Sequence, residues 1–184
     1  MEVIYSPETP PLSSKRVIFL AGPVRCAINW QQRFIDYAKA HPENFKDTVI
    51  ANPRGINELI TEADFTEDMF NAQVAWEEMY LEAAAKNGFI VFFLAEQFVI
   101  DLAQSYARTS RFELGEWFAE LKHNDNVKLI IGSDSKFQGL RYIKNRFESL
   151  FIKKPNIRKQ VTICDDGLNS LILTVNKLNS EHNG

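Results

Sequence analysis

The segment Phe89–Leu94 constrains the fold of this chain more than any other feature of its sequence. It is an uninterrupted apolar run (Phe-Ile-Val-Phe-Phe-Leu) and lacks the alternation of a strand that has one face in water. A strand of this composition is buried on both faces, which is typical of a parallel sheet covered by helices on both sides. The run Val17–Ala21 has the same character and ends at Gly22 and Pro23. Two such strands predict an α/β fold.

The rest of the chain alternates between short apolar runs and longer stretches with apolar residues at helical spacing. We expect strands at 17–21, 48–51, 89–94, 127–131 and 160–164, and helices at 29–40, 66–86, 111–121, 139–151 and 167–178. Thr66 or Asp64 can cap the second of these helices. This alternation predicts a three-layer α/β sandwich with right-handed crossovers. For five parallel strands the common order is 2-1-3-4-5, a flavodoxin-like and therefore Rossmann-like sheet. Such sheets bind ligands at the carboxyl ends of the strands where the order reverses, here 17–21 and 89–94.

A single domain is expected, because the chain has 184 residues of which 45% are apolar. Residues 1–15 are rich in proline and serine, a composition that resists helix formation, and we expect an extended lead-in before the fold starts. The domain is expected to span residues 16–178. Residues 179–184 have the composition of a polar tail.

Charge and hydropathy exclude several classes of function. The net charge of −3 gives no basic field for a polyanion, so we expect no nucleic-acid polymer among the partners. No apolar stretch approaches the roughly 20 residues of a membrane-spanning helix. The chain starts without a basic leader before an apolar segment, which favours a cytoplasmic protein that binds no membrane.

Few residues suit metal or cofactor chemistry. His41, His123 and His182 have no His or Cys at ligand spacing, and Cys26 and Cys164 form no CxxC pair, so we expect no metal site. The glycines form neither GxGxxG nor a P-loop, which removes the usual phosphate cradles of dinucleotides and triphosphates. If the protein is an enzyme, its working groups are expected to be carboxylates, without a cofactor.

One candidate carboxylate lies near the expected start of the helix at 111–121. Thr109 or Ser110 can cap this helix, which would put Glu113 in its first turn. The helix dipole favours an anion there by about 0.3–1 kcal/mol, so Glu113 is expected to stay ionised and can act as a nucleophile. Acids also occur in first turns only to complement the dipole, and the local pattern taken alone favours that role for Glu113 over a catalytic one.

Several motifs, in this order and spacing, resemble the nucleoside 2-deoxyribosyltransferase-like family over about residues 16 to 120. They are Phe-Leu-Ala-Gly-Pro at 19–23, Trp30 and Arg33, Asn-Pro-Arg at 52–54, Gln-Val-Ala-Trp-Glu at 73–77, and Ser-Arg-Phe-Glu-Leu-Gly at 110–115. Each motif is weak by itself, and the combination carries the resemblance.

The resemblance implies chemistry at the N-glycosidic bond of a nucleoside. Glu113 would be the nucleophile that forms a covalent glycosyl ester, which a second base resolves in a transferase and water resolves in a hydrolase. Glu77, with Glu78 as second choice, would supply the proton for the leaving base, although both could simply solvate a long helix. The partners are then a nucleoside or nucleotide and a free nucleobase.

The resemblance also implies substrate-binding residues. Gly22 and Pro23 would let the backbone approach the base or sugar, and Arg25 could reach a base edge or a phosphate. Trp76 or Trp30 could wall the pocket, the alternative for each being ordinary core packing. Ser110 and Arg111 would receive the sugar's 5′ hydroxyl or 5′ phosphate, and the loop at 133–136 lies on the same edge.

The chain departs from the family pattern in two places. The classical transferases carry a tyrosine on the first strand and an aspartate shortly before the nucleophile, whereas this chain has Ile18 and Phe19 on the strand and Ala107–Thr109 before Ser110. What orients Glu113 is therefore open. An N-glycosidase acting on nucleoside 5′-monophosphates and a non-catalytic nucleotide-sensing module are the alternatives. The 14 phenylalanines and the family both favour a homo-oligomer.

Overall fold

The computed structural model describes residues 1–10, 14–55, 66–100 and 105–181, apart from the side chains of residues 165 and 166. Within these ranges the strands are β1 (Glu2–Tyr5), β2 (Arg16–Ala21), β3 (Thr48–Asn52), β4 (Gly88–Leu94), β5 (Leu129–Ser133) and β6 (Val161–Asp166). The α-helices are α1 (Trp30–Ala40), α2 (Glu67–Lys86), α3 (Arg108–Glu120), α4 (Leu140–Lys153) and α5 (Leu168–Glu181), and the 3-10 helices include η1 (Pro42–Phe45) and η3 (Pro155–Gln160).

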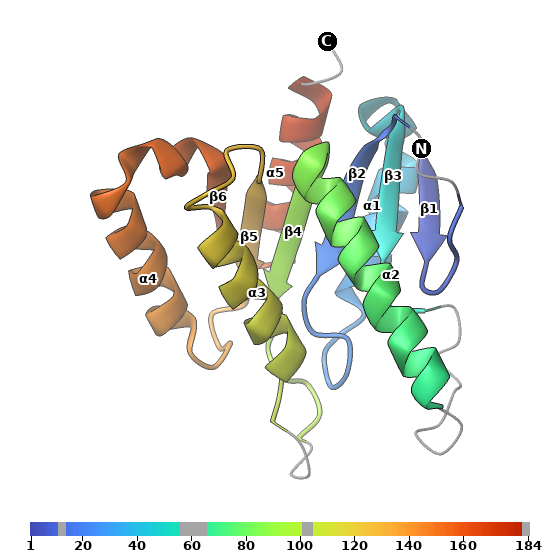
Figure 1. Ribbon diagram of the computed structural model, residues 1–184, viewed down its shortest axis with the longest axis horizontal. Coiled ribbons are helices and arrows are strands. Elements are labelled where there is room, and N and C mark those ends of the chain that lie inside the picture. Colours follow the sequence, from blue (N-terminus) through green and yellow to red (C-terminus); the bar gives the residue numbers. More distant parts are fainter. Residues whose placement is uncertain (11–13, 56–65, 101–104, 182–184) are drawn as a thin grey trace.

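The strands form one parallel sheet in the order β1-β3-β2-β4-β5-β6. The α/β class is confirmed, but the expected count of five strands and the order 2-1-3-4-5 are wrong. The five expected strands keep their relative positions, and β1 is added at the edge beside β3 (Figure 1). Glu2 pairs with Val49 and Tyr5 with Asn52, so the first residues belong to the sheet and are not a lead-in outside it.

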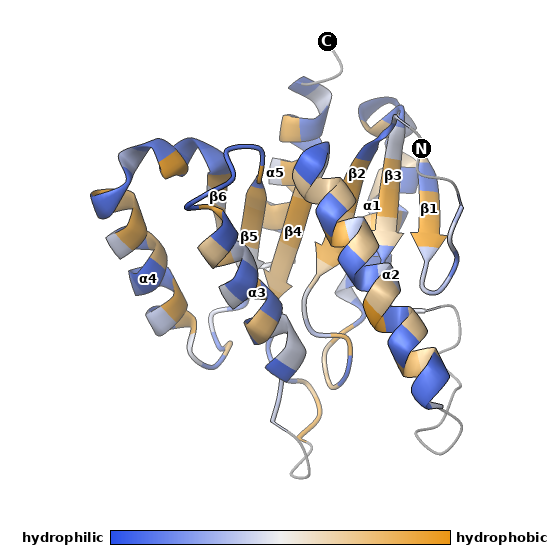
Figure 2. Cartoon of the chain, in the orientation of Figure 1, coloured by the Kyte–Doolittle hydropathy of each residue, from blue (hydrophilic) through white to orange (hydrophobic). Residues whose placement is uncertain are grey.

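Helices cover both faces of the sheet, as the buried strands require. Side chains of α2, α3 and α4 pack on one face, and side chains of α1 and α5 pack on the other. Figure 2 shows the strands as the most apolar part of the chain, with mixed hydropathy along the helices. In β4, every residue from Phe89 to Leu94 is buried. This is the structural reason for its unbroken apolar run.

The last helix is longer than the sequence indicates, and its end is buried. Asn179, expected in a polar tail, lies in α5 with no exposed surface. Its Nδ2 donates to the Asn44 carbonyl oxygen at 2.7 Å and to Thr48 Oγ1 at 3.2 Å, and its Oδ1 accepts from Arg16 Nη1 at 2.8 Å. These hydrogen bonds connect α5 to η1, β3 and β2. Residues 182–184 lie outside the described ranges.

Candidate functional site

Helices α2 and α3 bring the two candidate catalytic carboxyl groups together. Both helices pack on the same face of the sheet, and in the chain α2 comes directly before β4 and α3 after it (Figure 1). Glu77 lies in the middle of α2 and Glu113 in the middle of α3, and the charge of Glu77 acts on Glu113. Both residues are partly buried. The structure therefore places the two residues that the sequence analysis paired on helices of the same face, close enough for the charge of Glu77 to act on Glu113.

The start of α2 agrees with its sequence signals. Thr66 is the N-cap, and its hydroxyl oxygen accepts a hydrogen bond from the Met69 amide at 3.2 Å, which confirms one of the two expected caps. Asp64, the other expected cap, lies outside the described residues. The helix buries Trp76 and Tyr80 against the sheet.

The start of α3 differs from the expectation and changes the electrostatics of Glu113. The helix begins at Arg108, after Ala107 in the left-handed conformation (φ 55°), and neither Thr109 nor Ser110 is the cap. Glu113 therefore lies beyond the first turn, where the helix dipole has little effect. Ser110 is buried on the inner face of the helix, on the same side as Leu114 and Trp117.

Glu113 is not held in its ionised form. Burial and, after it, the negative charges of Glu77 and Glu116 together raise the pKa of Glu113 to about 7. Burial also raises the pKa of Glu77, while the hydrogen bond that Gln73 Nε2 donates to Glu77 Oε1 at 3.0 Å lowers it. A carboxyl group whose pKa lies near 7 can both accept and donate a proton near neutral pH, which suits acid–base chemistry.

The turn after β2 approaches β4 closely because Gly22 has no side chain. Gly22 has φ +142°, and a Cβ there would lie 2.4 Å from the Phe93 carbonyl oxygen. The next residue, Pro23, is buried, and its carbonyl accepts a hydrogen bond from Trp30 Nε1 at 3.2 Å. The turn is thus rigid and fixed at the carboxyl end of the central strands.

The segments after β2 and β4 meet, as the reversal of strand order predicts. The Phe98 amide donates to the Cys26 carbonyl oxygen at 2.7 Å, and the Val99 amide donates to the same oxygen at 3.3 Å. Arg54, after β3, donates from Nη2 to the Val24 carbonyl oxygen at 2.5 Å. Three loops therefore join at one edge of the sheet, next to α2 and α3.

Both tryptophans considered for a pocket wall are core residues. Trp76 is 2% exposed, and its Nε1 donates to the Glu8 carbonyl oxygen at 2.6 Å. Its ring packs on Tyr80 and Phe19, with centroid distances of 4.6 Å and 6.0 Å. Trp30 has no exposed surface. The packing alternative is correct for both, so neither presents its ring to a ligand.

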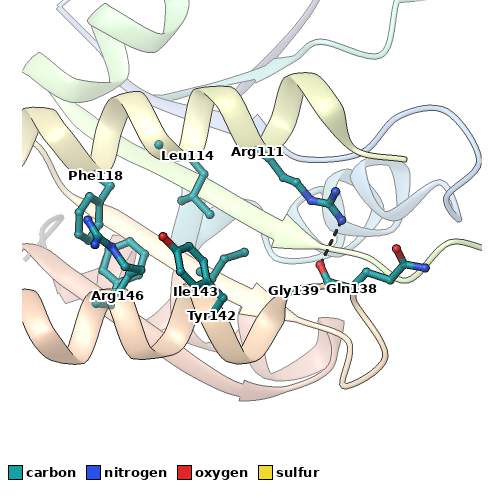
Figure 3. A pocket seen from close by; sticks show the side chains of 10 residues that line it. Arg111, Leu114, Phe118, Gln138, Gly139, Tyr142, Ile143 and Arg146 are labelled. Atoms are coloured by element: carbon teal, nitrogen blue, oxygen red, sulfur yellow. Dashed lines mark hydrogen bonds between the residues drawn. The ribbon is translucent and has the colours of Figure 1, made fainter. Parts of the chain in front are cut away.

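The two candidate arginines lie in different places. Arg111 points toward the turn before α4: its Nη2 donates to the Gln138 carbonyl oxygen at 3.1 Å (Figure 3). Its guanidinium carbon lies 5.2 Å from the centre of the Phe137 ring. Arg25 is exposed on the loop after β2, at the edge where the loops meet. The structure therefore separates Arg111 from the carboxyl pair and keeps Arg25 at the relevant edge.

Tyr106, which the sequence analysis did not single out, and Asp134, which lies in the loop at 133–136 that it did, both hold the segment after β4. The Tyr106 hydroxyl donates to the carbonyl oxygens of Ala95 and Glu96, at 2.8 Å and 3.1 Å. Asp134 Oδ2 accepts from the Glu96 amide at 2.9 Å. Burial and the neighbouring charge of Asp134 raise the pKa of Tyr106, which stays a protonated donor. Together they fix the turn after β4. The position of Asp134 directly after an apolar strand was the only available signal.

The described residues bring together no group of three or more His, Cys, Asp or Glu side chains that could hold a metal ion. In the same part of the chain, no helix has the length and apolar character to span a membrane. No protein-family model and no curated protein matches this chain.

Proposed function

We propose that the protein transfers or hydrolyses the N-glycosidic bond of nucleosides, with Glu113 as nucleophile and Glu77 as proton donor. The supporting observation is the pair of partly buried carboxyl groups on α2 and α3: the pKa values of both are raised, and the charge of Glu77 acts on Glu113. Two such groups with different surroundings are what a double-displacement reaction at an anomeric carbon requires. The family resemblance of the motifs supports the same substrate class.

The first half of the reaction breaks the bond to the base. A carboxylate oxygen of Glu113 attacks C1′ while the electrons of the C1′–N bond move to the base, and protonated Glu77 donates its proton to a ring nitrogen of the leaving base. The product is a glycosyl ester on Glu113 and a free base. In the second half, a new base nitrogen or a water oxygen attacks C1′, its proton passes to Glu77, and the Glu113 carboxylate leaves.

In this mechanism substrate binding has to favour protonated Glu77 and ionised Glu113. In the free protein the pKa of about 7 at Glu113 keeps that carboxyl largely protonated below neutrality. A bound base accepts a hydrogen bond only from a protonated Glu77, which favours the arrangement with Glu113 ionised. The pair thus becomes active when it holds one proton, so we expect a bell-shaped dependence of the rate on pH.

Base exchange is the direct test of this proposal. The protein is incubated with a deoxynucleoside and a second, labelled base, and the labelled nucleoside is measured. Glu113→Gln is expected to lower exchange and hydrolysis by about 10³-fold or more, and Glu77→Gln by about 10²–10⁴-fold. Glu120→Gln, an exposed glutamate on the same helix, is the matched control and is expected to keep full activity. Equal rates in the Glu113 variant and the unsubstituted protein would refute the nucleophile.

The alternatives give different results in the same assay. A nucleotide N-glycosidase would turn over the 5′-monophosphate and not the nucleoside, and it would depend on Arg25, since Arg111 is turned toward α4. A sensing module would show a ligand-induced thermal shift with no release of base. The turned Arg111 favours the nucleoside over the nucleotide.

A further inference from the structure

A groove between α3 and α4 lies outside the candidate site. Its volume is about 690 Å³, which is in the range of small-molecule sites. Apolar side chains of both helices line it, among them Leu114, Phe118 and Ile143 (Figure 3). Glu113 does not line the groove, because it is two positions from Arg111 and therefore about 200° around the helix. A molecule in the groove would lie on the other side of α3 from the proposed nucleophile.

Two arginines mark the ends of the groove. Arg111 on α3 lies near the turn before α4, where it donates to the Gln138 carbonyl oxygen (Figure 3). Arg146 on α4 lies at the other end, with its guanidinium carbon 5.4 Å from the centre of the Phe118 ring. Phe118 follows Arg111 by seven residues, which corresponds to about 10 Å along α3. The groove thus has an apolar lining and one positive charge toward each end.

Both guanidinium groups have donors left for a ligand. Each rests on an aromatic ring, Arg146 on Phe118 and Arg111 on Phe137, where the distance from the guanidinium carbon to the ring centre is 5.2 Å. A cation–π contact restrains the guanidinium and uses none of its N–H donors. Within the described residues, neither group forms an ion pair with a carboxylate. A guanidinium that is held in place and not neutralised is a typical receptor for a carboxylate.

The surroundings of the groove reinforce its preference for anions. Residues 136–160, which include α4 and η3, contain eight Lys or Arg and one Glu, an excess of seven positive charges. The one glutamate, Glu148, already forms an ion pair with Arg158 at 3.2 Å. The field of this segment therefore attracts anions to the side of the molecule that contains the groove.

Gly115 keeps the groove open. It lies in the interior of α3, where glycine lowers the stability of a helix relative to alanine. No packing contact requires glycine there, since an added Cβ would meet no atom within 4 Å. Gly115 does line the groove, so a side chain at this position would occupy its space. A ligand that lies against the backbone of α3 gives a physical reason for the glycine.

We propose that the groove binds an elongated apolar molecule with an anionic group at each end, such as a long-chain dicarboxylate. Its chain would lie over Leu114, Gly115 and Ile143. One carboxylate would accept hydrogen bonds from Arg111 and the other from Arg146. The inference does not depend on the proposed function.

Calorimetric titration of the full chain with decanedioate tests this site. Decanedioate is expected to bind with a Kd below about 1 mM, and more weakly at high salt. Decane-1,10-diol, which has the same chain without charges, is expected to bind at least about tenfold more weakly. Decanoate, with one carboxylate, should lie between the two. Equal affinities for the diacid and the diol, or for the diacid and decanoate, would overturn the proposal.

Variants of the lining residues locate the bound molecule. Arg111→Met and Arg146→Met each remove one charge and keep an unbranched side chain, and each is expected to weaken decanedioate binding by about tenfold or more. Arg158→Met removes a charge of the same segment outside the groove and is the matched control, which should bind like the unsubstituted protein. Gly115→Leu fills the open space and should abolish binding while the circular dichroism spectrum stays unchanged.

Variants of Arg111 and Arg146 that bind decanedioate as tightly as the unsubstituted chain would refute the site. The titration is also repeated at two protein concentrations, with the mass measured by sedimentation equilibrium. An affinity that falls as the protein associates would mean that a second copy of the chain covers the groove, and this result would overturn the proposal as well.

Discussion

The negative charge of Glu77 on α2 raises the pKa of Glu113 on α3, although a whole strand, β4, separates the two helices in the sequence. This influence is possible because the chain runs through the inner strand β4 between the two helices, and both helices pack on the same face of the sheet. Glu77 is thus part of the environment that sets the proton affinity of Glu113.

This coupling predicts a dependence of stability on pH. The pKa of Glu113 rises from 4.5 to about 7 on folding, so between these values the native state holds a proton that the unfolded chain has released. Stability is therefore expected to fall as the pH rises through this window, by up to about 3 kcal/mol. Urea unfolding at pH 5 and pH 8 measures the loss, which should be smaller in Glu113→Gln. Parallel profiles for the two proteins would show that the carboxyl is not buried as described.

Two glycines are predicted to respond in opposite directions to alanine. At Gly22 the added Cβ would lie 2.4 Å from the Phe93 carbonyl oxygen at a φ of +142°, so Gly22→Ala should cost more than about 2 kcal/mol. Gly115 lies in α3 with no atom within 4 Å of an added Cβ, so Gly115→Ala should stabilise by up to about 1 kcal/mol. Denaturant titration of both variants gives the comparison.

Trp76 is predicted to affect stability and not ligand binding. Trp76→Phe removes the hydrogen bond to the Glu8 carbonyl and part of the packing on Tyr80, which should cost about 1–3 kcal/mol. Because the ring is buried, KM for a nucleoside should not change. A large increase in KM with unchanged stability would instead mean that the ring contacts substrate.

Asn179 is predicted to be a stability residue despite its polar character. Asn179→Ala leaves the Asn44 carbonyl and Thr48 hydroxyl without this donor and Arg16 without this acceptor, at a cost of about 2–4 kcal/mol. Ser180→Ala, one residue further along, removes only an exposed bond to the Lys177 carbonyl and should change stability by less than about 0.5 kcal/mol. The unfolding temperatures of the two variants show whether the loss comes from the buried hydrogen bonds of Asn179 or from any substitution at the end of the helix.

The sequence was sufficient for the α/β class and for the five central strands, because buried parallel strands have continuous apolar runs that stand out from the helices. It was not sufficient for β1. Glu2–Tyr5 is a short edge strand with only one neighbour, and the prolines after it dominate the local composition. Edge strands of this length bury too little to leave a clear pattern.

Within the candidate site, motif spacing located Glu113, Glu77, Gly22 and Pro23, but it did not determine where side chains point. Arg111 is adjacent to Ser110 in sequence, yet a change of one residue rotates the side chain by about 100° around the helix. That rotation directs Arg111 to α4 and Ser110 to the core. Likewise, α3 begins at Arg108, after Ala107 in the left-handed conformation, and so earlier than a cap at Thr109 or Ser110 would place it. No residue type in the sequence marks such a start.

The buried amide of Asn179 also has a consequence for synthesis on the ribosome. Its partner Thr48 is 131 residues earlier in the chain. At the usual rate of translation, Thr48 emerges on the order of ten seconds before Asn179 can reach it. During that interval β3 and η1 of the nascent chain lack their final covering helix, so this surface is the one we expect chaperones to engage while the polypeptide is still being made.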